Sequence, residues 1–228
     1  MKIARALVLP YLLLLLVSFS DCQSERNRPQ TPIPSATPAL DSAKQMAAQL
    51  GSPDPMLRDE AATSIIKLAA ESDEFRRTVV TELVANVEAE NHAVIRCDTG
   101  CPEKYEKWRH SVEILGELKA STAIPALVKR IDFNDGRSGM SLTYYPCAKA
   151  LVKIGPTSVQ PLFETFTGND SDLPQILAVW TLRSIGDTTA RSALVKVLAF
   201  ERNRLRLNEI KLILEDWPEA GESDRKRP

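Results

Sequence analysis

The chain of 228 residues has few aromatic residues, no excess charge of either sign and few histidines. Phe, Trp and Tyr make up only 6%, whereas the strands of β-sandwiches and barrels favour such side chains. Lys and Arg (29) nearly balance Asp and Glu (30), so no long-range field attracts nucleic acid or an anionic membrane. Since Leu, Ala and Val dominate the apolar residues, the composition predicts an all-α protein.

Several catalytic signatures are also absent. The sequence contains no Walker phosphate loop, no nucleophile elbow and no H-E-x-x-H motif, and its two histidines offer few general bases. The many Asp and Glu residues are expected on the solvated faces of helices. We therefore expect a protein that is not an enzyme and that needs no cofactor or metal.

A short apolar run follows two basic residues at the N-terminus. Lys2 and Arg5 precede an apolar stretch at 6–17, which is shorter than the roughly 20 residues of a membrane-spanning helix. Ser18 and Ser20 stand three and one residues before a possible cut ahead of Asp21, as signal peptidase requires. The sequence predicts a cleaved signal peptide over 1–20, and the length of the run disfavours an uncleaved anchor.

Cys22 leaves a second form of export open. Its thiol lies at a suitable distance from the apolar run to be acylated as the first residue of a lipoprotein, although Phe19-Ser20-Asp21 departs from the usual Leu-Ala-Gly-like tripeptide. The Pro-rich segment 21–39 is predicted to be a disordered linker, which would suit a lipid anchor but also occurs in secreted proteins. We expect either a soluble periplasmic or secreted protein, or a lipoprotein that touches the membrane only through Cys22.

Three later segments resemble one another: 115–131, 151–166 and 182–198. Each contains the apolar end of one helix, a short turn and a second apolar helix. Apolar residues three or four apart keep one phase through five first helices, as a buried stripe requires. These stripes are Ala62, Ile65 and Leu68; Val112, Leu115 and Leu118; Ala148, Leu151 and Ile154; Val179, Leu182 and Ile185; and Leu207, Ile210 and Ile213.

The second helices carry their own stripes, and small residues precede the stripes of the first helices. Gly155-Pro156 and Gly186-Asp187 each end one helix and begin the next. The second-helix stripes are Val79, Val80, Leu83, Val84 and Val87; Leu127, Val128 and Ile131; Leu162, Phe163 and Phe166; and Leu194, Val195 and Leu198, and the small residues are Ala61, Ser111, Cys147 and Ala178. Lone helices at 40–50 and 205–217 are expected to cap the two ends.

The pattern A-x-x-L-x-x-I-G, a turn and x-x-L-x-x-x-L resembles the HEAT-like repeats of bacterial and phycobilisome-lyase-type proteins. The resemblance covers 54–214 and is best in 145–200. It implies a short α-solenoid of antiparallel helical hairpins, a HEAT-like or armadillo-type superhelix over 40–217, followed by a polar tail at 218–228. It implies surfaces that bind macromolecules and transfers no catalytic residue. The chain departs from the pattern at Lys119, where the units at 151–166 and 182–198 have glycine.

Two units of the repeat are longer than the others, with extra residues at 88–102 and 132–146. Both insertions follow a second helix and precede the next first helix. In a stack of hairpins such connections emerge on one edge, so we expect the two insertions to be neighbours. The sequence therefore predicts the functional site at this insertion edge.

The first insertion contains Cys97 and Cys101 on either side of a turn. In an exported protein they are predicted to form a disulfide that closes a small loop. A metal site with His92 and His110 matches no compact zinc spacing and is disfavoured. Cys147 is expected to be a buried free thiol, with a bond to Cys97 or Cys101 as the alternative.

Four residues of the insertions are candidates for binding a partner: Asp98, Arg137, Tyr144 and Tyr145. The alternative is that the tyrosines pack against the next helix. A calcium loop at 132–136 is disfavoured by its irregular acidic spacing. We expect a non-enzymatic protein-protein interaction scaffold of the cell envelope or secreted space. A structural spacer without a discrete site is the alternative, and an enzyme or lyase accessory is a lesser one.

Overall fold

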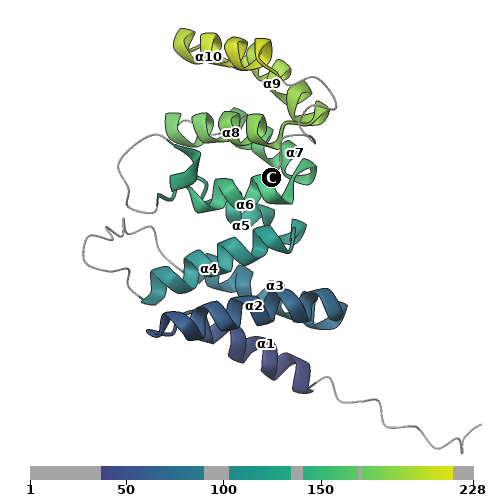
Figure 1. Ribbon diagram of the computed structural model, residues 1–228. Helices are drawn as coiled ribbons and strands as arrows, with labels where there is room; N and C mark the ends of the chain where they lie inside the picture. The colour runs from purple at the N-terminus through teal and green to yellow at the C-terminus, as the bar shows by residue number, and fades with distance from the viewer. Residues whose placement is uncertain (1–36, 90–102, 135–140, 169–170, 218–228) are drawn as a thin grey trace, which may run out of the picture. The chain divides into compact units, whose positions relative to one another are not determined.

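The computed structural model of the protein describes residues 37–89, 103–134, 141–168 and 171–217. These residues form ten α-helices and three short 3₁₀ turns, and no β-strand occurs among them (Figure 1). The expected all-α class is confirmed for this part of the chain. The predicted signal peptide and the polar tail lie outside the described residues. The α-helices are α1 Thr37–Gln49, α2 Pro55–Glu71, α3 Asp73–Ala89, α4 Glu103–Glu117, α5 Ile124–Val128, α6 Pro146–Ile154, α7 Val159–Gly168, α8 Asp172–Ile185, α9 Thr188–Phe200 and α10 Arg204–Glu215.

The helices contact one another in two series. In one series α2, α4, α6, α8 and α10 each contact the next member, and in the other α1, α3, α5, α7 and α9 do the same. The two series are joined by contacts between helices that follow one another in the chain, such as α3 with α4 and α7 with α8 (Figure 1). The lone helices expected before the first unit and after the last are observed as α1 and α10.

The predicted first-helix stripes form the core. Ile65, Leu115, Leu151 and Leu182 are completely buried, and the small residues expected before the stripes are buried as well. The second-helix stripes are buried less uniformly, because Val195 is 46% exposed. The amphipathic period therefore predicted the buried faces of α4, α6 and α8 correctly, whereas Ala62 and Leu68 of α2 and Leu207 of α10 are only half-buried.

Gly116 brings α4 and α6 into close contact. A Cβ atom at this position would lie 3.0 Å from Cα and 3.2 Å from Cβ of Ala150. Two helix backbones can approach this closely only where one residue has no side chain. The missing side chain at Gly116 and the apolar stripes of the two helices therefore let α4 and α6 pack closely.

Three turns between helices of the repeat use the left-handed or otherwise positive-φ region. Gly155 (φ 84°) and Gly186 (φ 73°) end α6 and α8, as predicted, and Lys119 takes φ 48° at the position where the repeat lacks its glycine. The amide of Ala120 donates to the oxygen of Leu115 and that of Lys119 to the oxygen of Gly116, both at 3.0 Å. This is a Schellman cap, so the turn is retained although its residue is a lysine.

Helix α5 is shorter than the sequence predicted. The stripe of Leu127, Val128 and Ile131 indicated a helix through residue 131, but the α-helix ends at Val128. Beyond that point Arg130 and Ile131 donate to the carbonyls of Leu127 and Val128 in tighter turns. Ile131 is nevertheless buried, as its place in the stripe required.

Candidate binding groove

The described ends of the two insertions lie together. The ring of Phe133, at the start of the second insertion, lies 4.3 Å from that of Trp108 and 6.2 Å from that of Tyr105, just after the first insertion. Nη2 of Arg130 donates to the main-chain oxygen of Glu88, where the first insertion begins, over 2.7 Å. The expectation that the insertions are neighbours therefore holds for these ends, and it is carried by an aromatic cluster and a buried arginine.

The structure corrects one candidate residue of this edge. Tyr145 was expected to be an exposed recognition residue, but it is only 3% exposed, and Tyr144 is half-buried against the core. Tyr145 directly precedes α6, where its side chain turns inward with the buried start of that helix. The tyrosines thus match the alternative that they pack against neighbouring helices. Asp98 and Arg137 lie outside the described residues.

Among the cysteines, Cys147 is described, and it is a buried free thiol as predicted. Burial raises the pKa of this thiol well above its usual range, so the neutral form is favoured. Cys22 and the predicted disulfide pair Cys97 and Cys101 lie outside the described residues. Within the described ranges no three His, Cys, Asp or Glu side chains are grouped so that they could hold a metal ion, and no helix is long and apolar enough to cross a membrane.

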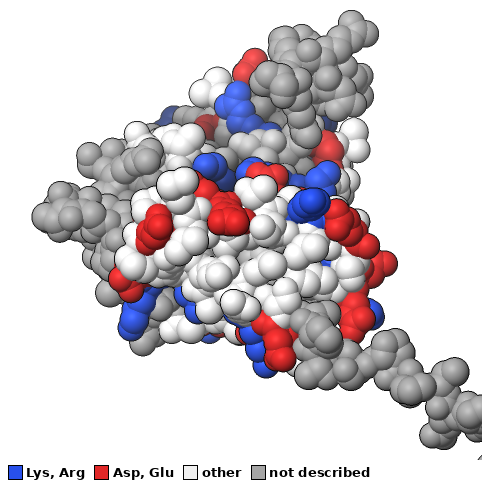
Figure 2. All heavy atoms as spheres, turned by 60° about the horizontal axis from the view of Figure 1, so that its bottom comes forward, with Lys and Arg blue, Asp and Glu red and all other residues white. Residues whose placement is uncertain are grey.

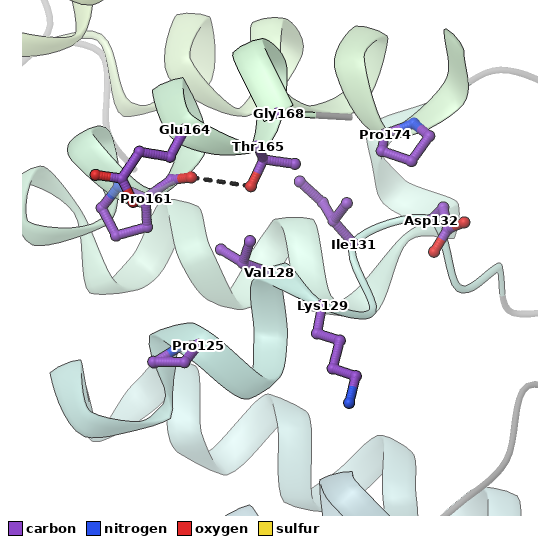
Figure 3. A pocket seen from close by; sticks show the side chains of 10 residues that line it. All are labelled: Pro125, Val128, Lys129, Ile131, Asp132, Pro161, Glu164, Thr165, Gly168 and Pro174. Atoms are coloured by element: carbon purple, nitrogen blue, oxygen red, sulfur yellow. Dashed lines mark hydrogen bonds between the residues drawn. The ribbon is translucent and has the colours of Figure 1, made fainter. Parts of the chain in front are cut away.

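A groove of about 530 Å³ lies between α5 and α7 (Figure 3). The α7 wall is one helix face whose residues lie three, four and seven apart, whereas the other wall is the single turn of α5 and the tighter turns that follow it. The α5 side supplies Pro125, Val128, Lys129, Ile131 and Asp132; α7 supplies Pro161, Glu164, Thr165 and Gly168; and Pro174 of α8 closes one end.

The groove combines an apolar floor with charges at its rim. Ile131 and Pro174 are buried and Val128 is half-buried, whereas Lys129, Asp132 and Glu164 are exposed. The hydroxyl of Thr165 already donates its hydrogen within its own helix, to the carbonyl of Pro161 over 2.9 Å (Figure 3). The surface is suited to apolar contact, with orientation supplied by opposite charges.

The short α5 lies directly beside the groove. Arg130 is 6% exposed and is drawn into the protein, where it satisfies a carbonyl in the last turn of α3. After α5 the chain continues in tighter turns, in which Arg130 and Ile131 stay on the buried side, three and four residues after Leu127, while Lys129 and Asp132 line the groove.

The groove reaches the insertion edge. Asp132 is the first residue of the second insertion, and Gly168 and Pro174 flank the connection between α7 and α8. The sequence predicts the functional site at this edge, but none of the groove residues is among its partner-binding candidates. The segments 125–131 and 159–168 were interpreted only as buried stripes. Pro125 and Pro161 gave no separate signal, because both lie in the first turn of a helix, where proline is common.

A second, smaller cleft of about 230 Å³ lies among α2, α4 and α6 and contains His110. The Nε2 atom of His110 lies 3.6 Å from Oε2 of Glu106, and its Nδ1 lies 3.9 Å from Oε2 of Glu113. Arg109 forms ion pairs with both carboxylates, at 2.8 and 2.9 Å. Burial and the charge of Arg109 lower the pKa of His110 despite the two carboxylates, so the neutral ring is favoured. These four side chains lie three and four residues apart on one face of α4 and pair with one another.

Charges of both signs are mixed on the face that Figure 2 turns toward the viewer. Lys and Arg side chains alternate with Asp and Glu around an area that carries neither. On this face no single-sign patch favours a polyanion, in line with the nearly balanced composition.

Comparison with known proteins found no family model that matches the chain and no curated protein that matches it.

Proposed function

We propose that this chain is a protein-binding module built as a short α-solenoid of HEAT-like hairpins, and that the groove between α5 and α7 receives a segment of a partner protein. The two series of helix contacts support the solenoid, since each hairpin of such a stack contacts the hairpins before and after it. The recurrent turns at Lys119, Gly155 and Gly186 support the repeat.

The observation that carries the binding role is the groove itself. It joins a buried apolar floor to an exposed rim with Lys129 on one wall and Glu164 on the other. Its carboxylates are exposed and lie on different walls, which suits recognition better than general acid-base catalysis in a dry site. A groove on the row of second helices beside the insertion edge also allows the insertions to contribute to the same partner.

Site-specific photo-crosslinking tests this proposal. A photoreactive amino acid replacing Glu164 is expected to crosslink the full chain to a protein of the cell envelope or secreted fraction, and the same replacement of exposed Arg191 on α9 is the control. Val128→Arg is expected to abolish the Glu164 crosslink, because a long cation would fill the apolar floor. The matched control is Val195→Arg, at the equivalent position of the repeat outside the groove. Thermal unfolding would show that each variant folds.

A chain that crosslinks equally from positions 164 and 191, or equally with and without Val128→Arg, has no partner in the groove. That result would leave the structural spacer as the better description.

The proposed place of action is outside the cytoplasm, on the basis of the N-terminal sequence. Intact mass of the mature protein before and after reduction tests it. We expect a mass that begins at Asp21, or at an acylated Cys22, and a gain of two hydrogens on reduction if Cys97 and Cys101 form a disulfide. A mature chain that retains Met1 would contradict export by a cleaved signal.

A further inference from the structure

We infer that the occupant of the groove between α5 and α7 is a short amphipathic α-helix of the partner protein. This inference rests on the proposed function, and it specifies the secondary structure and the charge pattern of what binds. Three features of the groove support it. Its backbone groups are already hydrogen-bonded, its walls are formed by α7 and by α5 with the turns after it, and its rim carries charges of opposite sign.

The backbone that lines the groove is already hydrogen-bonded. The carbonyls of Pro125, Val128 and Arg130 accept from Lys129, Ile131 and Phe133 at 3.1 to 3.2 Å. The prolines at 125, 161 and 174 have no amide hydrogen to donate. An extended peptide gains affinity by pairing its main chain with an exposed strand edge, and this groove has none to offer. A helix satisfies its own main chain, so it can enter an apolar groove without leaving polar groups unpaired.

The shape of the groove matches a helix as well. One wall is a face of α7 with side chains three, four and seven residues apart, the other is α5 with the turns after it, and a ridge of a third helix can pack between them. Helix α5 has five residues whereas α7 has ten, so at about 1.5 Å per residue α5 is about half as long. A docked helix would lie against α7 where α5 stops, and would cover the floor formed by Val128 and Ile131.

The charges at the rim predict the pattern of the partner helix. Lys129 follows α5 and forms no ion pair with another described residue, and Glu164 on the α7 wall accepts only from Gln160 of its own helix, at 2.8 Å. A helix with apolar residues at i, i+3, i+4 and i+7 would therefore carry an acidic residue on the flank toward Lys129. The flank toward Glu164 would carry a basic residue.

Two displayed peptide libraries test the inference against the full chain. One presents a helix on a stable helical scaffold, randomised at its exposed face; the other presents linear peptides with prolines at alternate positions, which cannot be helical. We expect enrichment from the helical library alone, with apolar residues at i, i+3, i+4 and i+7. Binding should be lost with Gly168→Trp, which fills the groove where a Cβ meets nothing within 4 Å, and kept with Val195→Arg.

Charge reversal provides a second measurement that does not disturb the core. Lys129→Glu is expected to weaken a selected helix with an acidic flank by about threefold to tenfold, and reversing that acidic residue to lysine should restore the affinity. Lys211→Glu, on the exposed face of α10, is the matched control.

The outcomes separate this inference from the proposed function. If proline-rich linear peptides are enriched and are displaced by Gly168→Trp, the groove binds protein segments but not as helices, and the inference is wrong. Selected helices that bind Gly168→Trp as well as the unchanged chain would also overturn it. If neither library yields a binder that depends on the groove, the proposed function fails together with the inference.

Discussion

Nη2 of Arg130 donates to the main-chain oxygen of Glu88 over 2.7 Å, although 42 residues separate them in the chain. The bond ties the turn after α5 to the last turn of α3, at the points where the two insertions begin. It supplies a donor to a carbonyl in the last turn of a helix, where carbonyls have no partner within the helix. One buried side chain therefore joins the two insertions at their bases, next to the residues that line the groove.

Replacing Arg130 tests this relationship. Arg130→Met keeps much of the aliphatic volume but removes the charge-assisted hydrogen bond to the carbonyl of Glu88, so we expect the free energy of unfolding to fall by about 1–3 kcal/mol. Lys129→Met, one residue earlier and exposed, is expected to stay within about 0.5 kcal/mol of the unchanged chain. Chemical denaturation measures both. Equal stabilities of the two variants would show that the bond does not matter for folding.

Replacing Lys119 with glycine is expected to stabilise the protein. Its φ of 48° is costly for a residue with a Cβ atom, and its side chain is exposed, so little is lost by removing it. Lys119→Gly is expected to raise the free energy of unfolding by about 0.5–1 kcal/mol. Lys119→Ala keeps the Cβ atom and should give no such gain. A stabilisation by alanine as large as that by glycine would place the effect elsewhere than in the backbone conformation.

Glu201 predicts a dependence of stability on pH. Burial alone would raise the pKa of its carboxyl, but hydrogen bonds from Arg206 (2.7 Å) and from the amide of Asn203 outweigh burial and lower the pKa. Because the folded pKa lies below the unfolded one, the stabilisation is complete above the ordinary value of about 4.3 and is lost as the pH falls through the folded value.

Glu201→Gln should remove that part of the pH dependence. Urea denaturation between about pH 3 and pH 7 is expected to give a flatter stability profile for Glu201→Gln than for the unchanged chain. Glu215→Gln, at the exposed end of α10, is the control. A profile that keeps its acid slope without the Glu201 carboxyl would assign the slope to other groups.

Cys147 is expected to resist alkylation while the protein is folded. It has no exposed surface, and burial raises the pKa of its thiol, so the reactive thiolate is suppressed. At about pH 8, iodoacetamide should modify the peptide that contains Cys147 only after unfolding, as measured by mass spectrometry of the digest. Rapid modification of the native protein would contradict the burial. A Cys147 peptide linked to another cysteine before reduction would contradict the free thiol.

The parts of the fold that could be predicted are those set by local pattern. The stripes of Ile65, Leu115, Leu151 and Leu182 follow the helical period, so their burial could be expected before any packing was known. Gly155 and Gly186 end helices for a reason that is local to each residue. Lys119 departs from the pattern but keeps the turn, because the two hydrogen bonds of its Schellman cap hold it.

The candidate site could be predicted only in part. The excess length of two units indicated the edge where Phe133 meets Trp108. The period did not reveal that Tyr145 turns inward, because a residue before a helix has no helical phase. The groove residues were hidden because they belong to the same helices as the core stripes.

The sequence by itself determined that the described chain is a series of amphipathic helices, which of their faces are buried and where most of the turns fall, since each of these depends on spacing over a few residues. Only the tertiary structure decided where α5 stops and that a groove opens beside α7. Such features come from contacts between residues distant in the chain, as between Arg130 and the carbonyl of Glu88, and these contacts leave no trace in local periodicity.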